Sequence, residues 1–161
     1  MASPNRRITL TSNSTPSPCG ASASSEFIGT SAFNAFDGTK DVAGTEWITN
    51  NTTTGYLIYD FGSAIWAIDG IGIQPQATAR APKNFTVEGS VDGVSYDVLL
   101  TVTNQTVWTS NVMTDFAITG NNKRYRYIKI NVSANNGDAN FLEIEEVYFY
   151  ARDLSITIST E

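Results

Sequence analysis

Residues 84–93 read Asn-Phe-Thr-Val-Glu-Gly-Ser-Val-Asp-Gly, and no other stretch says as much about the class of fold. Apolar and polar side chains alternate in it, which is the period of a strand with one buried face, here the face of Phe85 and Val87. Asp92-Gly93 favours a tight hairpin turn because glycine adopts positive φ readily. The chain then returns through another apolar run, residues 96–102. The stretch therefore predicts an antiparallel β-hairpin.

Similar short runs lie on both sides of this hairpin, separated by turn signals rich in Gly, Asn and Asp. Residues 31–36 favour a single helical turn, and nothing indicates a longer helix. In the run before the hairpin, Ile65, Ile68, Ile71 and Ile73 are the expected core residues. The expected strands cover residues 56–62, 65–73, 84–91, 96–102, 106–108, 113–118, 125–130 and 141–150, with 8–11 and 154–158 as candidates for two more. This pattern predicts an all-β fold, an antiparallel jelly-roll β-sandwich.

Composition and charge exclude several classes of function. The 161 residues suit one domain, and ten Lys and Arg against sixteen Asp and Glu give a net charge of −6. This balance argues against nucleic acid and against an anionic membrane as partners, since both attract basic patches. The chain has no histidine, which excludes Ser-His-Asp and Cys-His catalysis and His-ligated zinc. Cys19 is the only cysteine, so no internal disulfide can form.

A second informative stretch, residues 34–47, reads Asn-Ala-Phe-Asp-Gly-Thr-Lys-Asp-Val-Ala-Gly-Thr-Glu-Trp and is rich in oxygen atoms. Asp37-Gly38 marks a turn, and the carboxylates, hydroxyls and carbonyls around it are the ligands that Ca²⁺ prefers. Phe36 and Trp47 would fix the turn to the core. Two interpretations stay open, a calcium site or an Asx-type turn without metal.

Four features follow one another in an order that resembles a known family. They are residues 35–38 (Ala-Phe-Asp-Gly) followed by Trp47, 59–62 (Tyr-Asp-Phe-Gly), 85–93, and 125–130 (Tyr-Arg-Tyr-Ile-Lys-Ile) before 145–150 (Glu-Glu-Val-Tyr-Phe-Tyr). Together they resemble the discoidin domain, also called the coagulation factor 5/8 C-terminal-type domain, and in character the family 32 carbohydrate-binding modules. The resemblance covers residues 20–151 and implies a discoidin-like (galactose-binding-domain-like) jelly-roll sandwich with ligand loops at one end. Residues 1–19 would form an N-terminal arm with a short strand, and residues 152–161 a C-terminal extension.

Many members of this family hold one structural Ca²⁺ between the Asp-Gly loop and the last strand. Carried over to this chain, the resemblance implies a set of five ligands: Asn34, Asp37, Thr39, Thr45 and Glu146. Thr39 stands where the family often has Asp or Asn, and the gap to Thr45 is longer than usual. The ion would pin the loop to the sheet and favour the folded state.

Sugar-binding members of the family use an aromatic face and a few fixed polar groups on the end loops. Carried over, the resemblance implies Phe141 as the stacking platform. Arg80 and Asn140 would bond sugar hydroxyls, with Asn135 assisting. The family's usual histidine is absent. The alternative is that Phe141 is the first core residue of its strand and Arg80 a solvated loop charge.

A non-catalytic carbohydrate-binding module is therefore the main hypothesis, with a cell-surface glycan or a polysaccharide as partner. No pair of carboxylates stands out as catalytic, because the acidic run of Glu143, Glu145 and Glu146 is interpreted as a solvated face plus one cation ligand. We expect an extracellular or virion-associated protein, for example part of a bacterial glycosidase or of a phage tail. Residues 1–7 contain no apolar segment after the arginines, so no signal peptide is expected there.

Two other hypotheses stay open. The first is a structural or protein-interaction domain, with residues 8–11 and 154–158 as assembly contacts in a homo-oligomer or in a fusion to a larger protein. The second, less favoured, is a lipid-binding discoidin domain that uses the apolar pair Phe27-Ile28.

Overall fold

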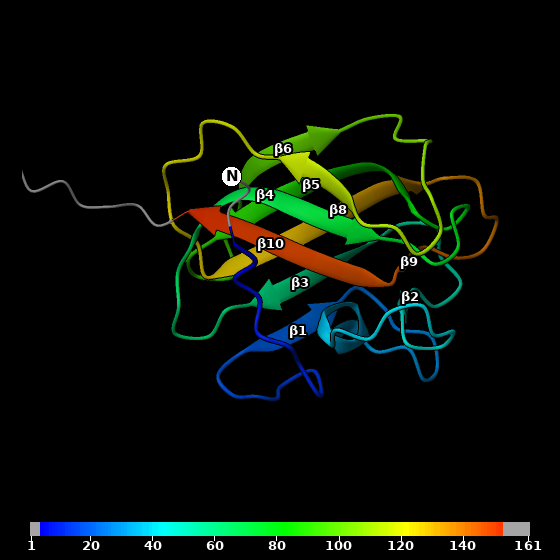
Figure 1. Ribbon diagram of the computed structural model, residues 1–161, viewed down its shortest axis with the longest axis horizontal. Coiled ribbons are helices and arrows are strands. Elements are labelled where there is room, and N and C mark those ends of the chain that lie inside the picture. The colour runs from blue at the N-terminus through cyan, green and yellow to red at the C-terminus, as the bar shows by residue number, and fades with distance from the viewer. Residues whose placement is uncertain (1–3, 153–161) are drawn as a thin grey trace, which may run out of the picture.

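The structure, a computed structural model, describes residues 4–152. The elements are β1 (Gly20–Ala23), the 3₁₀ turn η1 (Ala32–Phe36), β2 (Trp47–Ile48), β3 (Gly55–Asp60), β4 (Ala67–Gln74), β5 (Pro82–Ser90), β6 (Asp97–Val102), β7 (Thr114–Ala117), β8 (Tyr127–Asn135), β9 (Glu143–Ile144) and β10 (Glu146–Arg152). They form a five-stranded sheet, β1-β3-β8-β5-β6, and a three-stranded sheet, β10-β4-β7, with β2 and β9 paired at one end (Figure 1). Every strand pair of the described residues is antiparallel.

The core lies between the two larger sheets and follows from the alternation along their strands. In β8, Ile128, Ile130 and Val132 are buried, while the residues between them are more exposed. From the other sheet, β4 contributes Ile71 and Ile73, both fully buried. Each large apolar side chain that leaves water contributes about 1.5–3 kcal/mol to folding. Two half-buried sheets of this kind are stable only when their apolar faces meet, so the alternation produces the sandwich.

The structure confirms the all-β jelly-roll sandwich and the hairpin at residues 84–102. Phe85 lies opposite Val102 across β5 and β6, and both Phe85 and Val87 are buried. Residues 31–36 form the expected single turn, now seen as η1. In the part of the chain that the structure describes, no helix is long and apolar enough to cross a membrane.

Some expected elements differ in the structure. Ile65 is 46% exposed, because it precedes β4 and does not take part in its alternation. Residues 106–108 form no strand, since Trp108 turns its indole N–H toward the carbonyl oxygen of Pro82 at 3.1 Å. The expected last strand is divided at Glu145 into β9 and β10.

The N-terminal arm, residues 4–19, lies against the sandwich and connects its two sheets (Figure 1). Asn5 forms a bridge to Tyr150 of β10, which is an edge strand. Tyr59 of β3 donates its hydroxyl to the carbonyl oxygen of Ile8 at 2.7 Å and accepts the Ile8 N–H at 2.9 Å. Leu10 is 1% exposed. The arm is thus part of the packed structure, although residues 8–11 form no strand; the other candidate, 154–158, lies outside the described residues.

Candidate functional site

Three loops meet at the end of the sandwich where β4 and β8 finish (Figure 1). The loop of residues 136–142 lies against the loop of residues 75–81 through main-chain hydrogen bonds. Asn136 and Asp138 each donate an N–H, to the carbonyl oxygens of Ala81 and Ala79, both at 2.9 Å. The third loop carries Phe27 and approaches from the β1–η1 connection. We call this the loop end; it contains all four residues expected to bind sugar.

Arg80 and Phe141 lie together at the loop end. The guanidinium carbon of Arg80 is 5.0 Å from the centre of the Phe141 ring, a cation–π arrangement. Arg80 also pairs with Asp138 at 3.3 Å and with Glu143 at 3.5 Å, and its side chain is 31% exposed. Arg80 is therefore a fixed, partly accessible group and not a freely solvated loop charge. A binding role for either residue stays a prediction.

Asn135 and Asn140 have different positions within the same loop. Asn135 donates its amide to the carbonyl oxygens of Asp138 and Phe141 at 2.8 and 2.7 Å, so its side chain closes the loop. Asp138 Oδ1 accepts the N–H groups of Asn140 and Phe141, both at 2.8 Å. These two backbone donors, assisted by Arg80, lower the pKa of Asp138. The Asn140 side chain is exposed. Asn135 thus positions the loop, whereas Asn140 is accessible to a ligand.

Phe27 joins this group, which the sequence did not indicate. Its ring contacts the Phe141 ring edge to face, with centroids 5.6 Å apart and an interplanar angle of 79°. Phe27 is 37% exposed and its neighbour Ile28 is 88% exposed. We call the Phe27–Phe141 pair the aromatic ledge. The only signal in the sequence is an apolar pair inside a polar run, and that signal does not identify its partner.

The acidic run before the last strand is buried, so its interpretation as a solvated face is wrong. Glu143, Glu145 and Glu146 all have 0% exposure. Glu143 accepts the N–H groups of Gln76 and Ala77 at 3.0 and 2.8 Å, and burial raises its pKa. Backbone donors of this kind offset the cost of taking a carboxylate out of water. Each glutamate therefore anchors a loop.

Glu145 anchors the loop that follows the Asp-Gly turn. It accepts the N–H of Asp41 at 2.7 Å and the side-chain amide of Gln74 at 2.9 Å. Asp41 has a positive φ of 64°. A carboxylate from the sheet thus holds the middle of this loop, a task that the sequence assigned to a metal ion.

Three of the residues expected to bind calcium make hydrogen bonds to protein groups instead. Asp37 Oδ1 accepts the N–H of Thr39 at 2.6 Å, which is the Asx-type turn of the alternative interpretation. The side chain of Asn34 donates to the carbonyl oxygen of Glu46 at 3.3 Å. The Thr45 hydroxyl donates to the carbonyl oxygen of Val42 at 2.7 Å.

Glu146 does reach the Asp-Gly turn, but its carboxylate is also bound by Arg7. Its Oε1 accepts the Gly38 N–H at 3.3 Å, and its two oxygens accept Nη1 and Nη2 of Arg7, each at 2.7 Å. Burial raises the pKa of Glu146 to about 7, although Arg7 opposes this shift. Within residues 4–152, no three acidic or thiol side chains gather as metal ligands. In this arrangement the residues do not fit Ca²⁺, and calcium binding stays a prediction.

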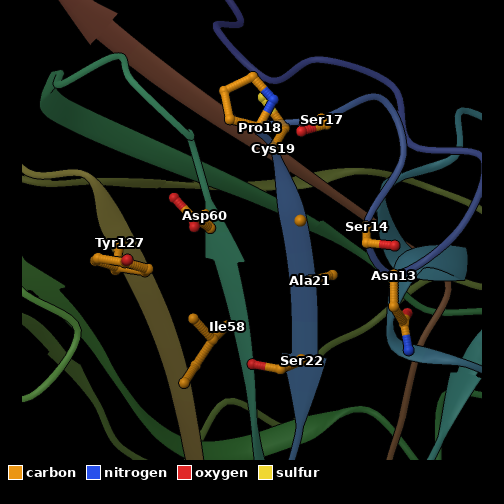
Figure 2. A pocket seen from close by; sticks show the side chains of 11 residues that line it. Asn13, Ser14, Ser17, Pro18, Cys19, Ala21, Ser22, Ile58, Asp60 and Tyr127 are labelled. Atoms are coloured by element: carbon orange, nitrogen blue, oxygen red, sulfur yellow. The ribbon is translucent and has the colours of Figure 1, made fainter.

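A separate hollow of about 330 Å³ lies between the arm and strands β1, β3 and β8 of the five-stranded sheet (Figure 2). Tyr127, which lines it, begins β8, whereas the loop of residues 136–142 follows the other end of that strand. Arg126 lies 4.8 Å from the Tyr127 ring and bonds both oxygens of Asp60, another lining residue. The hollow is lined by both polar and apolar groups, and Arg126 occupies one face of the Tyr127 ring. The aromatic ledge is better suited to stack on a sugar.

Comparison with known proteins agrees with this fold. The family model of the F5/8 type C domain matches residues 20–147. Among curated protein sequences, no relative matches the chain.

Several solved structures share the fold at low sequence identity. One is chitosan-binding module 1 of a chitosanase/glucanase from Paenibacillus sp. IK-5, with 16% identity and a TM-score of 0.68 over 92% of this chain and 100% of that chain. Another is the family 32 carbohydrate-binding module of NanJ from Clostridium perfringens, in complex with galactose, with 21% identity and a TM-score of 0.64 over 82% of this chain and 93% of that chain. A third is CpGH89CBM32-5 from Clostridium perfringens, in complex with GalNAc-β-1,3-galactose, with 19% identity and a TM-score of 0.66 over 83% of this chain and 95% of that chain.

Proposed function

Because the chain belongs to the F5/8 type C domain family, we propose that it is a non-catalytic glycan-binding module that binds sugar at the loop end. The observation that carries this proposal is the aromatic ledge beside Arg80. An apolar ring face next to fixed hydrogen-bond donors is the combination that a pyranose requires, since a pyranose has one apolar face and a rim of hydroxyls.

Each group at the loop end has a distinct task in this proposal. The exposed part of Phe27, with Phe141 beside it, supports the apolar face of the sugar. Arg80 donates its Nε–H to Asp138 and forms an ion pair with Glu143, and these two contacts hold the guanidinium while its other donors are available to hydroxyls. The accessible amide of Asn140 bonds a further hydroxyl. The surface is shallow, so binding to one sugar is weak and gains strength from several copies.

The charges at the loop end favour a neutral glycan. Asp138 and Glu143 both pair with Arg80, Glu46 lies close enough to Glu143 to raise its pKa, and the whole chain carries a charge of −6. A uronic or sialic acid would bring another negative charge to this group, at a cost that solvent screens only in part. We therefore place neutral sugars ahead of acidic ones.

The proposed setting is the outside of a cell or a virion, where the module would belong to a larger protein such as a glycosidase or a phage tail protein. One supporting comparison is CBM32-3, which is part of a family 31 glycoside hydrolase from Clostridium perfringens. Catalysis is not part of the proposal, since Glu143, Glu145 and Glu146 are buried and anchor loops.

A glycan array that contains neutral and acidic glycans tests the proposal, followed by titration of the best ligand. Phe141→Ala and Phe27→Ala should each weaken binding about tenfold or more, because each removes part of the stacking surface. Arg80→Ala should weaken it as well. Tyr127→Ala, which removes a ring that lines the hollow, is the matched control and should bind as the parent does. Melting temperatures show that each variant is folded.

Two outcomes would contradict the proposal. Loss of binding in Tyr127→Ala with full binding in Phe141→Ala would move the site to the hollow. A folded parent that binds no glycan would favour the interaction-domain hypothesis. Binding to phosphatidylcholine vesicles should be measured alongside the glycans, because Ile28 is 88% exposed beside Phe27. Vesicle binding that depends on this pair would favour the lipid-binding hypothesis.

A further inference from the structure

Arg7 occupies the place where the arm, the Asp-Gly turn and the last strand meet. Its guanidinium forms two parallel hydrogen bonds to Glu146, each 2.7 Å long. The two side chains are 4% and 0% exposed. The same Glu146 carboxylate accepts the Gly38 N–H at 3.3 Å. One buried carboxylate therefore joins the arm to the loop.

The surroundings fix Arg7 from several sides. Its neighbour Arg6 donates its backbone N–H to the carbonyl oxygen of Phe149 at 2.9 Å, and Ile8 is held at both backbone groups by Tyr59. The guanidinium carbon lies 5.0 Å from the centre of the Tyr148 ring. Main-chain bonds on both sides of Arg7 thus set its position, so that its fork geometry matches the carboxylate.

Calcium would need the atoms that these contacts already use. The ion takes about six to eight oxygen ligands at short distance. Both oxygens of Glu146 point at Arg7, and one oxygen of Asp37 accepts the Thr39 N–H. Glu145, the other carboxylate at this loop, is occupied by Asp41 and Gln74. A divalent cation could enter only after the guanidinium leaves.

We propose that Arg7 replaces the metal ion at this site, so that the chain carries its own cation and holds the Asp-Gly loop without calcium. The arm becomes a structural requirement for the loop next to the loop end, because it delivers the charge. This inference is independent of the proposed glycan binding. It concerns the stability of the folded chain, and a negative glycan array would leave it unchanged.

Thermal melting of the full chain, with chelator and with millimolar Ca²⁺, tests the inference. The parent should melt at the same temperature in both. Arg7→Ala should melt roughly 6–20 °C lower, because it leaves Glu146 as an uncompensated buried charge. This variant should also gain a calcium-dependent rise in melting temperature that the parent lacks, since Asp37 and Glu146 are then free to bind the ion.

Arg126→Ala is the matched control, because Arg126 makes the same two-bond contact with Asp60 at 2.8 and 2.9 Å. That pair is 39% and 22% exposed, so its loss should lower the melting temperature less, with no calcium response. Arg7→Lys keeps the positive charge but cannot form the two parallel hydrogen bonds to Glu146. Its melting temperature should lie between those of the parent and Arg7→Ala, with no calcium response.

A lower melting temperature of the parent in chelator would overturn the inference, and so would an Arg7→Ala variant that melts as the parent does. If Arg7→Ala fails to fold, the melting temperatures of Arg7→Lys and of the parent, with chelator and with Ca²⁺, still test the inference. Calorimetric titration of the parent with Ca²⁺ should give no binding heat, and saturable binding would show that the ion displaces Arg7.

Discussion

The two loops near the end of the sandwich are held in different ways. The loop of residues 37–45 is anchored by side chains from far along the sequence, Arg7, Glu145 and Glu146. The loop of residues 135–141 has its side-chain anchors within it, Asn135 and Asp138, whose partners lie two to six residues away. Main-chain hydrogen bonds also hold it against the loop of residues 75–81. The charged side chains that anchor the first loop come from distant parts of the chain, whereas the side chains that close the second loop are its own.

This difference predicts how each loop fails. Loss of a distant anchor leaves buried charges and donors without partners, so it should reduce the stability of the whole domain. Loss of a local anchor frees a few residues at the surface, so it should reduce ligand affinity more than stability. The following predictions test this division, starting with the largest effect.

Glu145→Ala should lower the free energy of unfolding by about 3 kcal/mol or more, because the Asp41 N–H and the Gln74 amide lose a buried charged acceptor. Urea denaturation at neutral pH measures this change. Lys123→Ala is the control, since Lys123 pairs with Asp97 at the surface and its side chain is 71% exposed, so the stability should change little. Equal losses in the two variants would contradict the distinction between the loops.

Asp138→Asn should lower glycan affinity about tenfold, because a neutral amide oxygen accepts the Asn140 and Phe141 N–H groups more weakly and pairs less well with Arg80. The melting temperature should change only slightly. Titration with the glycan found on the array gives the affinity. A large drop in melting temperature with unchanged affinity would reverse the roles of the two loops.

The pH dependence of binding should also follow Asp138. Its pKa is lowered from the usual 3.8, so its contribution is present above that value and is lost as pH falls through the lower folded pKa. The contribution of Asp138 to glycan affinity should therefore be unchanged from neutral pH down to about pH 4 and be lost only at pH values below the usual 3.8. Titrations at several pH values test this, with Asp138→Asn expected to be less sensitive in the acid range.

Each loop also has a glycine with positive φ, Gly38 at 80° and Gly137 at 119°. An added Cβ at Gly38 would meet only the Thr9 side chain at 3.7 Å, and at Gly137 nothing within 4 Å. Gly38→Ala should therefore cost only about 1 kcal/mol, the strain of a left-handed backbone. Gly137→Ala should act mainly on glycan affinity. Urea denaturation and titration of both variants compare the two positions.

The sequence predicted the features that depend on local pattern. Alternation identified the hairpin of β5 and β6, and the turn chemistry of Asp37-Gly38 and of residues 135–140 identified the two loops. The family resemblance brought Arg80 and Phe141 to the same end.

The features that the sequence did not indicate all depend on long-range pairing. Arg7 and Glu146 are 139 residues apart, and Phe27 and Phe141 come from loops that only the topology brings together. The acidic run of Glu143, Glu145 and Glu146 has the composition of a surface. It is buried because Arg7 and N–H groups of distant residues donate hydrogen bonds to its carboxylates. No local pattern contains that information.

The arm has a further effect on the outer margin of β10. This edge of the strand is already hydrogen-bonded along part of its length, because the main chain at Phe149 and Ala151 bonds Pro4, Asn5 and Arg6. A chain shortened to begin at residue 10 would offer those unpaired groups to a neighbouring molecule, and strand addition between copies would follow. Residues 4–6 thus also cover part of an otherwise open sheet edge.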